Sequence, residues 1–163
     1  MTPRVSVGDR VPQATLGRMI DGVMHTVELH ELLAGRRAVI AGVPGAFTPV
    51  CTCRHIPDLL ENVSRLKSAG YNLIACVVPN SPWAVAAWAE EVDPAGEMVF
   101  LSDGNLAFAR SLGVTVAAHD LMLGETSARY LLATENGLVR RFNVETKITN
   151  VDCTRARDVL MMD

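Results

Sequence analysis

The feature that most constrains the fold is an alternation of short apolar runs with a segment of helical periodicity. Arg37–Val43 (RAVIAGV) is apolar without alternation, which is typical of a buried strand, and Tyr71–Val78 (YNLIACVV) has the same character. Between them, from Cys51 to Ala69, apolar residues recur at helical spacing, and Gly70 ends the pattern. The sequence therefore predicts strand, helix and strand in this order.

Further elements follow the second strand. Ser81-Pro82 supplies a helix cap followed by a proline suited to the first helical position. From there the pattern predicts a helix to about Val92, a strand at Met98–Leu101, and a short helix at Asn105–Leu112 closed by Gly113.

The two ends of the chain carry hairpin signals. Asn136-Gly137 lies between apolar runs at Arg129–Ala133 and Leu138–Val144, and Asp21-Gly22 interrupts Ala14–Leu29. A closing helix is predicted from about Thr154 to Met161. This order of elements predicts an α/β fold with a mixed central sheet, flanking helices and an N-terminal β-hairpin extension, compatible with a thioredoxin-like fold.

Composition excludes several classes of protein. A chain of 163 residues with 49% hydrophobic and 20% charged residues predicts a single globular domain, 1–163, rather than a disordered chain. The net charge of −3, without a basic stripe, argues against nucleic acid as a partner. The longest strictly apolar run, Leu73–Val78, is far shorter than the roughly 20 residues that span a bilayer. Since MTPRVSVGDR also lacks the apolar stretch of a signal peptide, we expect a cytoplasmic protein without membrane contact, whose four cysteines are free or reactive.

The most informative residues run from Pro44 to Cys51 (PGAFTPVC). Thr48 can cap a helix and Pro49 suits its first position, which places Cys51 in the first turn. Unpaired backbone N–H groups and the helix dipole favour an anion there, so a thiol loses its proton more readily and becomes nucleophilic. A buried, inert cysteine is the alternative.

The run PGAFTPVCTCRHIP resembles the active-site loop of the peroxiredoxins, whose pattern is Pro, three residues, Thr, two residues, Cys. The flanking PGAF and His55-Ile56-Pro57 are similar to the peroxiredoxin 5 subfamily in particular. Further matches follow in order along nearly the whole chain: Asn80, Pro82-Trp83, Phe100-Leu101-Ser102-Asp103-Gly104, Ser127-Ala128-Arg129-Tyr130 and Asn143-Val144-Glu145.

The resemblance implies a thiol-dependent peroxidase that reduces hydrogen peroxide and organic hydroperoxides through a sulfenic acid at Cys51. Thr48 would donate to a peroxide oxygen, and Arg129 would favour the thiolate and hold the developing oxyanion. Pro44, which has no N–H, would limit water around the sulfur. Recycling would fall to a thiol reductant, namely thioredoxin, glutaredoxin or glutathione. No cofactor or metal is implied. The resemblance also implies a homodimer, and the apolar candidates for its interface are Phe47 and Trp83.

The resemblance offers two candidates for a resolving cysteine. Cys153 lies ten residues after Asn143, where animal-type members carry theirs, and Cys76 matches the position used in plant-type members. Cys76 lies in an apolar strand and is expected to fill the core, so reachability favours Cys153. The polar segment 150–154 is expected to open easily.

Three other residues bear on the site. Cys53 departs from the family pattern, and a Cys51–Cys53 bridge is doubtful because residues two apart face different sides of a helix. Thr126 stands where many relatives have a further arginine. His55 is expected to pack or to hydrogen-bond structurally rather than to act as a base.

The alternative function is a thioredoxin-fold disulfide reductase or a redox-sensing binding protein. Such reductases carry a C-x-x-C pair, whereas this chain has Cys51-Thr52-Cys53 together with a Pro/Thr/Arg set that reductases do not need. The sequence therefore favours the peroxidase.

Overall fold

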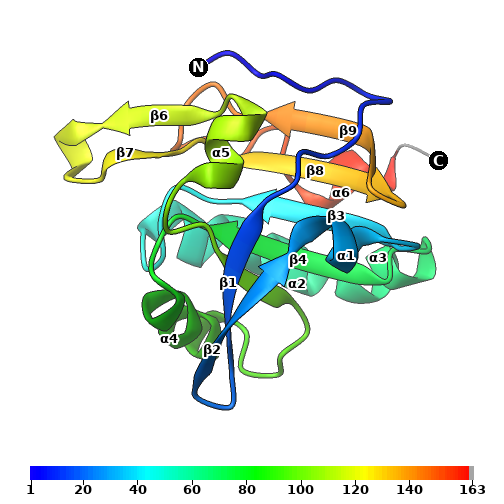
Figure 1. Cartoon of the computed structure of the whole chain (residues 1–163), viewed down its shortest axis with the longest axis horizontal. Coiled ribbons are helices and arrows are strands. Elements are labelled where there is room, and N and C mark those ends of the chain that lie inside the picture. The colour runs from blue at the N-terminus through cyan, green and yellow to red at the C-terminus, as the bar shows by residue number, and fades with distance from the viewer. Residues whose placement is uncertain (162–163) are drawn as a thin grey trace.

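The computed structural model describes residues 1–161, so the last two residues of the predicted domain 1–163 lie outside it. Its centre is a seven-stranded sheet in the order β2-β1-β5-β4-β3-β8-β9 (Figure 1). The strands are β1 Thr15–Ile20, β2 Val23–Glu28, β3 Arg37–Gly42, β4 Leu73–Val78, β5 Val99–Ser102, β8 Tyr130–Glu135 and β9 Leu138–Val144. Strands β3, β4 and β5 are parallel, whereas β8, β9 and the β1–β2 hairpin pair antiparallel. The predicted mixed sheet is confirmed.

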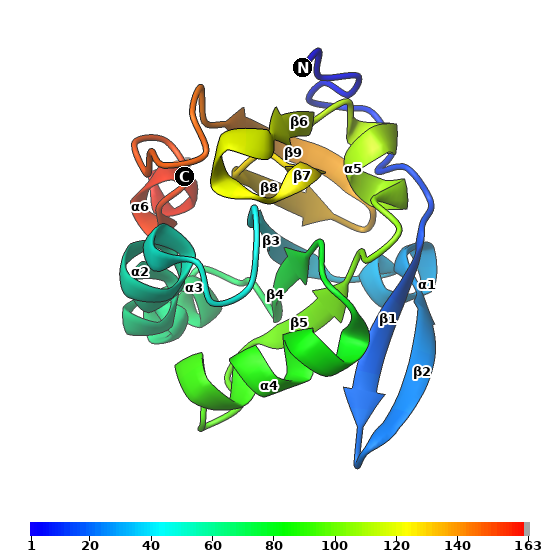
Figure 2. The same cartoon turned by 90° about the vertical axis from the view of Figure 1, so that its left-hand side faces the viewer.

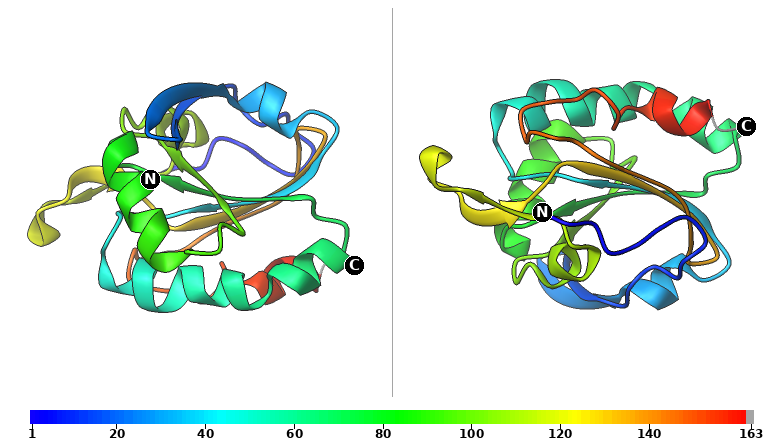
Figure 3. Two further views of the ribbon diagram at one scale, coloured as in Figure 1. Left: turned by 90° about the horizontal axis from the view of Figure 1, so that it is seen from below. Right: turned by 90° about the horizontal axis from the view of Figure 1, so that it is seen from above.

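Helices cover both faces of the sheet (Figure 2, Figure 3). One face carries α2 Ile56–Glu61, α3 Val63–Ser68, α4 Pro82–Val92 and α6 Ala156–Leu160, and the other carries α1 Leu29–Leu33 and α5 Ala107–Leu112. The two faces explain why β3 is apolar throughout. Val39 and Ala41 pack in the core under α2, α3, α4 and α6, while Ala38 and Ile40 pack in the core under α1 and α5.

Both predicted hairpins form at the predicted turns. Asp21 and Gly22 have φ of 49° and 78°, and Asn136 and Gly137 have φ of 48° and 75°. Positive φ at both central residues is the geometry of a two-residue turn whose twist matches the strands. Ser81 caps α4 by accepting from the Ala84 N–H, as predicted.

The helix predicted from Cys51 to Ala69 is instead divided into three pieces. A wide π-type turn spans Cys51–His55, in which the Ile56 N–H donates to the Cys51 carbonyl, and α2 and α3 follow. Pro57 has no N–H for the carbonyl four residues earlier, and its ring would clash with that carbonyl in a regular helix. Asn62, between α2 and α3, turns its side-chain amide onto the Asp58 carbonyl and leaves helical geometry at φ −109°.

Neither the short helix α1 nor a second, smaller sheet was predicted. Strands β6 Thr115–Ala118 and β7 Gly124–Ser127 form a separate two-stranded sheet, joined through a 3₁₀ turn at His119–Leu121. This arm projects from the body of the molecule (Figure 1) and lies above the loop that leaves β3 (Figure 2). Its strands are only four residues long, too short for a clear alternating pattern.

Candidate active site

Cys51 lies where the loop after β3 enters the helical segment. The Thr52 N–H donates to the Thr48 carbonyl at 3.0 Å, so Cys51 falls in the first turn, as predicted, and its side chain is fully buried. The Thr48 hydroxyl does not cap this turn. It donates instead to the Gly45 carbonyl at 2.7 Å, because the loop folds back on itself before the helix begins.

The loop is fastened from two other elements. The Asn80 side chain, after β4, accepts from the Ala46 N–H at 2.9 Å. From β7, the buried Thr126 hydroxyl donates to the Pro44 carbonyl at 2.6 Å. Thr126 is the position where many relatives have an arginine, so this chain has there a neutral support for Pro44 rather than a second charge.

Arg129 brings a positive charge to the sulfur from just before β8. Arg129 is 1% exposed, and its Nη2 donates to Cys51 Sγ at 3.3 Å. Nη1 contacts His55 Nδ1 at 3.0 Å, and Nε and Nη2 donate to the Ile148 carbonyl at 3.3 and 2.8 Å. A buried guanidinium held on three sides is a fixed positive charge next to the Cys51 sulfur.

His55 belongs to the same network, which the sequence analysis missed. Its ring is buried, with Nε2 2.9 Å from the Thr154 carbonyl. Burial, reinforced by the Arg129 charge, lowers the pKa of His55 from 6.5 to about 3. The expected structural hydrogen bond is therefore present at Nε2, but the other ring nitrogen, Nδ1, contacts Arg129 of the site. The sequence signal for this role was that His55 lies four residues after Cys51, since residues four apart share a helix face.

A cavity of about 190 Å³ lies beside the loop that precedes Cys51, with Arg129 in its wall. It is lined by Pro44, Thr48, Pro49, Val50, Leu121, Leu123, Arg129, Ile148 and Thr149. Three of the four predicted site residues thus meet around one cavity, and the fourth, Cys51, lies buried beside Arg129. Among the larger cavities, those of about 390 and 440 Å³ lie against β1 and α4.

The other cysteines differ sharply in their surroundings, and all four thiols are free. Cys76 in β4 is fully buried as predicted, and burial, together with the Cys51 charge, raises its pKa well above the ordinary range. Cys153 is partly exposed, and burial followed by the Glu145 carboxylate raises its pKa to about 11. Cys53 is exposed while Cys51 is buried, which agrees with their predicted opposite orientations.

The segment around Cys153 is held more firmly than its polar composition predicted. The buried Glu145 accepts through Oε1 from the Asp152 and Cys153 N–H groups, at 2.7 and 2.8 Å, and from the Thr154 hydroxyl at 2.9 Å. The Asn143 side chain donates to the Cys153 carbonyl at 2.8 Å. The polar groups of the segment are therefore paired inside the protein rather than with water, so its opening, which stays a prediction, has to break these hydrogen bonds.

Within residues 1–161, no helix combines the length and apolar character needed to cross a membrane. The same residues contain no group of three His, Cys, Asp or Glu side chains arranged to hold a metal ion.

Comparisons with known proteins place this geometry in a family. The Redoxin family model matches residues 6–160. The chain is 41% identical over 146 residues to Peroxiredoxin-2E-2, chloroplastic, of rice, covering 86% of this chain and 65% of that protein. It is 34% identical over 143 residues to Peroxiredoxin-2B of Arabidopsis thaliana, covering 87% of this chain and 88% of that protein. The chain thus spans slightly less than two thirds of the rice relative and most of the Arabidopsis one.

Among solved structures, reduced Prx3 in complex with H2O2 from Vibrio vulnificus superposes with a TM-score of 0.90 at 33% identity, covering 97% of this chain and 95% of that one. The fold is therefore thioredoxin-like, as the order of elements predicted. The matched span and the identity to these relatives establish that this chain belongs to the peroxiredoxins, within the redoxin family.

Proposed function

We propose that this chain is a thiol-dependent peroxidase that reduces hydrogen peroxide and organic hydroperoxides at Cys51. The observation that carries the proposal is the 3.3 Å contact between the buried Arg129 guanidinium and Cys51 Sγ, beside a cavity lined by Pro44 and Thr48. A disulfide reductase would need a second cysteine beside the first, whereas Cys53 is exposed and Cys51 buried. Peroxide reduction needs only one activated sulfur, and the contact from Arg129 supports Cys51 in that role.

The proposed first step is displacement at the O–O bond of the peroxide. The Cys51 thiolate attacks the terminal oxygen of ROOH, an S–O bond forms, and the O–O bond breaks to release RO⁻, which takes a proton from water. Cys51 becomes a sulfenic acid, oxidised by two electrons, while the peroxide is reduced to ROH or water. Arg129 stabilises both the thiolate and the negative charge that moves onto the leaving oxygen. The Thr48 hydroxyl lies at the cavity wall and, because its hydrogen is donated to the Gly45 carbonyl, offers its oxygen as an acceptor there. Pro44 presents no N–H to bind water.

The second proposed step is attack of a thiol on the sulfenic sulfur, which forms a disulfide and releases water. Cys153 is the internal candidate we prefer because it is partly exposed, unlike Cys76. With a pKa of about 11, however, on the order of one Cys153 thiol in ten thousand is ionised at pH 7 in the closed segment. Internal resolution therefore requires the segment to leave Glu145, and thioredoxin, glutaredoxin or glutathione completes the cycle.

Assembly, subfamily, domain and compartment are further parts of the proposal. Phe47 and Trp83 are 53% and 63% exposed, and large apolar side chains at the surface support a two-fold homodimer. Sedimentation at micromolar concentration should give a dimer, and Trp83→Arg should shift it to the monomer; a wild-type monomer would refute this part. The remaining parts of the proposal concern subfamily, domain and compartment. The loop PGAFTPVCTCRHIP supports membership of the peroxiredoxin 5 subfamily. A single domain over 1–163 and a cytoplasmic location stay predictions from the sequence.

Replacing Cys51 by serine tests the function directly. Serine has almost the same shape but stays protonated at neutral pH, so consumption of hydrogen peroxide with a thiol donor should stop. Cys53→Ser is the matched control, because Cys53 is exposed on the outer side of the same turn. Appreciable turnover by Cys51→Ser would refute the assignment.

A further inference from the structure

We propose that His55 is a positioning residue, whose neutral ring holds the Arg129 guanidinium against the Cys51 sulfur and is itself held by the segment that carries Cys153. The proposal rests on the proposed peroxidase and adds a residue to its machinery. His55 is not among the residues that line the cavity, and its Nδ1 contacts Arg129, so it acts through Arg129 rather than on the peroxide.

The hydrogen bonds at both ends of the ring assign its tautomer. A guanidinium can only donate, so His55 Nδ1, 3.0 Å from Arg129 Nη1, is the acceptor. A carbonyl oxygen can only accept, so Nε2, 2.9 Å from the Thr154 oxygen, carries the proton and donates. A protonated imidazolium would set two donors against each other at Nδ1. The ring therefore works in its neutral form, in agreement with the lowered pKa.

The position of the guanidinium depends on these acceptors. Its Nη2 reaches Cys51 Sγ only while the planar group keeps its orientation, and that plane is fixed by His55 on one side and the Ile148 carbonyl on another. Since the guanidinium is buried, water does not replace a lost acceptor. Removing the His55 acceptor should therefore leave the charge in place but let its direction toward the sulfur relax.

The same ring links the site to the Cys153 segment. Thr154, whose carbonyl accepts the hydrogen bond from His55 Nε2–H, is fully buried and directly follows Cys153. Its hydroxyl donates to Glu145, which also holds the Cys153 N–H. An opening of this segment removes the partner of His55, so the reduced, closed segment supports the geometry in which Cys51 meets peroxide.

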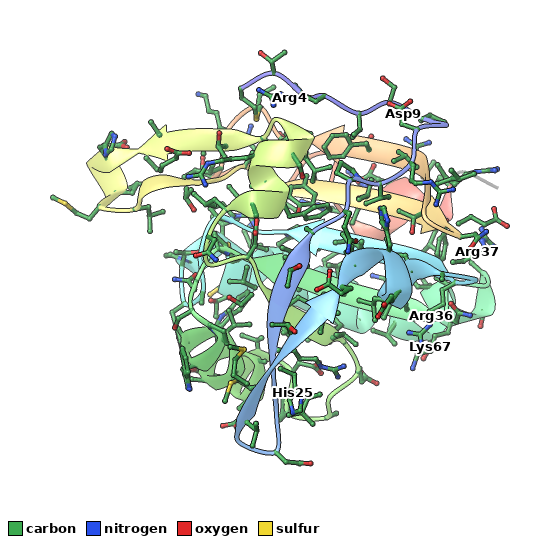
Figure 4. All side chains as sticks on the ribbon, in the orientation of Figure 1. Arg4, Asp9, His25, Arg36, Arg37 and Lys67 are labelled. Atoms are coloured by element: carbon green, nitrogen blue, oxygen red, sulfur yellow. The ribbon has the colours of Figure 1, made fainter. Side chains whose placement is uncertain are left out.

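Two substitutions separate the two ends of the ring. In His55→Asn the side-chain oxygen takes the place of Nδ1, which keeps the acceptor for Arg129 and loses the donor to Thr154. In His55→Gln the longer amide reaches the place of Nε2, which keeps the donor and loses the acceptor. His25→Asn is the control, since His25 is exposed on β2, in the hairpin at the edge of the sheet (Figure 4).

Two readouts are measured for each variant: the second-order rate constant for Cys51 oxidation by hydrogen peroxide, and the pH profile of Cys51 alkylation by iodoacetamide. We expect His55→Gln to oxidise about tenfold more slowly, with its alkylation profile moved to higher pH. We expect His55→Asn to stay within about twofold of the wild type in both, although it is less stable than the wild type in urea because the buried Thr154 carbonyl loses its donor.

The ordering of the variants decides the proposal. Equal rates and equal alkylation profiles for the two variants, or a loss of rate that simply follows the loss of stability, would overturn it. Failure of the peroxidase itself is recognisable separately. In that case the wild type consumes no peroxide, while the alkylation profiles still report whether His55 positions Arg129.

Discussion

Replacing Arg129 by methionine is the most direct test of the electrostatic reasoning. Methionine keeps an unbranched stem of similar bulk but removes the charge and every donor. The contact from Nη2 to Cys51 Sγ at 3.3 Å disappears, and both His55 Nδ1 and the Ile148 carbonyl lose their donor. The rate of Cys51 oxidation and the free energy of unfolding should therefore both decrease, by different amounts.

The change in the activation free energy of Cys51 oxidation should be larger than the change in the free energy of unfolding. Removing one preorganised donor from a buried site costs about 3 kcal/mol of transition-state stabilisation, which corresponds to roughly a hundredfold in rate. The free energy of unfolding changes in two opposing ways. Two acceptors without partners cost about 1–3 kcal/mol each where they stay buried, whereas a buried charge no longer has to be desolvated. We expect a net loss of about 2 kcal/mol.

The assay is stopped-flow oxidation of the reduced protein by hydrogen peroxide under pseudo-first-order conditions, alongside urea unfolding. Arg140→Met is the matched control, because Arg140 in β9 is exposed and pairs only loosely with Glu135 at 3.7 Å. That variant should keep the wild-type rate and stability. If folded Arg129→Met reacted within twofold of the wild type, the role given to the guanidinium would be wrong.

Three further outcomes follow from the surroundings of single residues. Cys153→Ser should keep the fast oxidation of Cys51 but accumulate its sulfenic and sulfinic forms, detected by mass spectrometry; normal turnover with thioredoxin would show that Cys153 does not resolve. Trp88 donates to the Thr52 hydroxyl at 3.1 Å, next to Cys51, so we expect oxidation of Cys51 to change the tryptophan fluorescence. Trp88→Phe should abolish this change, whereas Trp83→Phe should retain it. A signal that survives Trp88→Phe would exclude this residue as the reporter. Because the folded-state pKa of His55, about 3, lies below its unfolded value of 6.5, the unfolded chain binds the proton first as the pH falls. This contribution to stability is complete above pH 6.5 and is lost toward pH 3, so the wild type should lose about 2 kcal/mol between pH 7.5 and 5 that His55→Asn does not lose; parallel curves would contradict the buried neutral ring.

The sequence by itself determined the elements whose signals are local. The apolar runs of β3 and β4, the Ser81 cap, and the Asp21-Gly22 and Asn136-Gly137 turns follow from side-chain burial and backbone preference within a few residues. The place of Cys51 at the start of a helix is equally local. These predictions succeeded because neighbouring residues alone set the conformation.

Only the tertiary structure decided which distant groups meet. Arg129 reaches Cys51 across 78 positions, and His55 reaches the Thr154 carbonyl across 99, contacts that depend on how β8 and the final segment pack beside the first helical turn. Likewise, the polar character of 150–154 indicated a loose segment, whereas the buried Glu145 pairs its polar groups and holds it closed. Composition tells which groups can form hydrogen bonds, but the partner is fixed by packing, and here packing decides both the charge at the sulfur and the state of the cysteine proposed to resolve it.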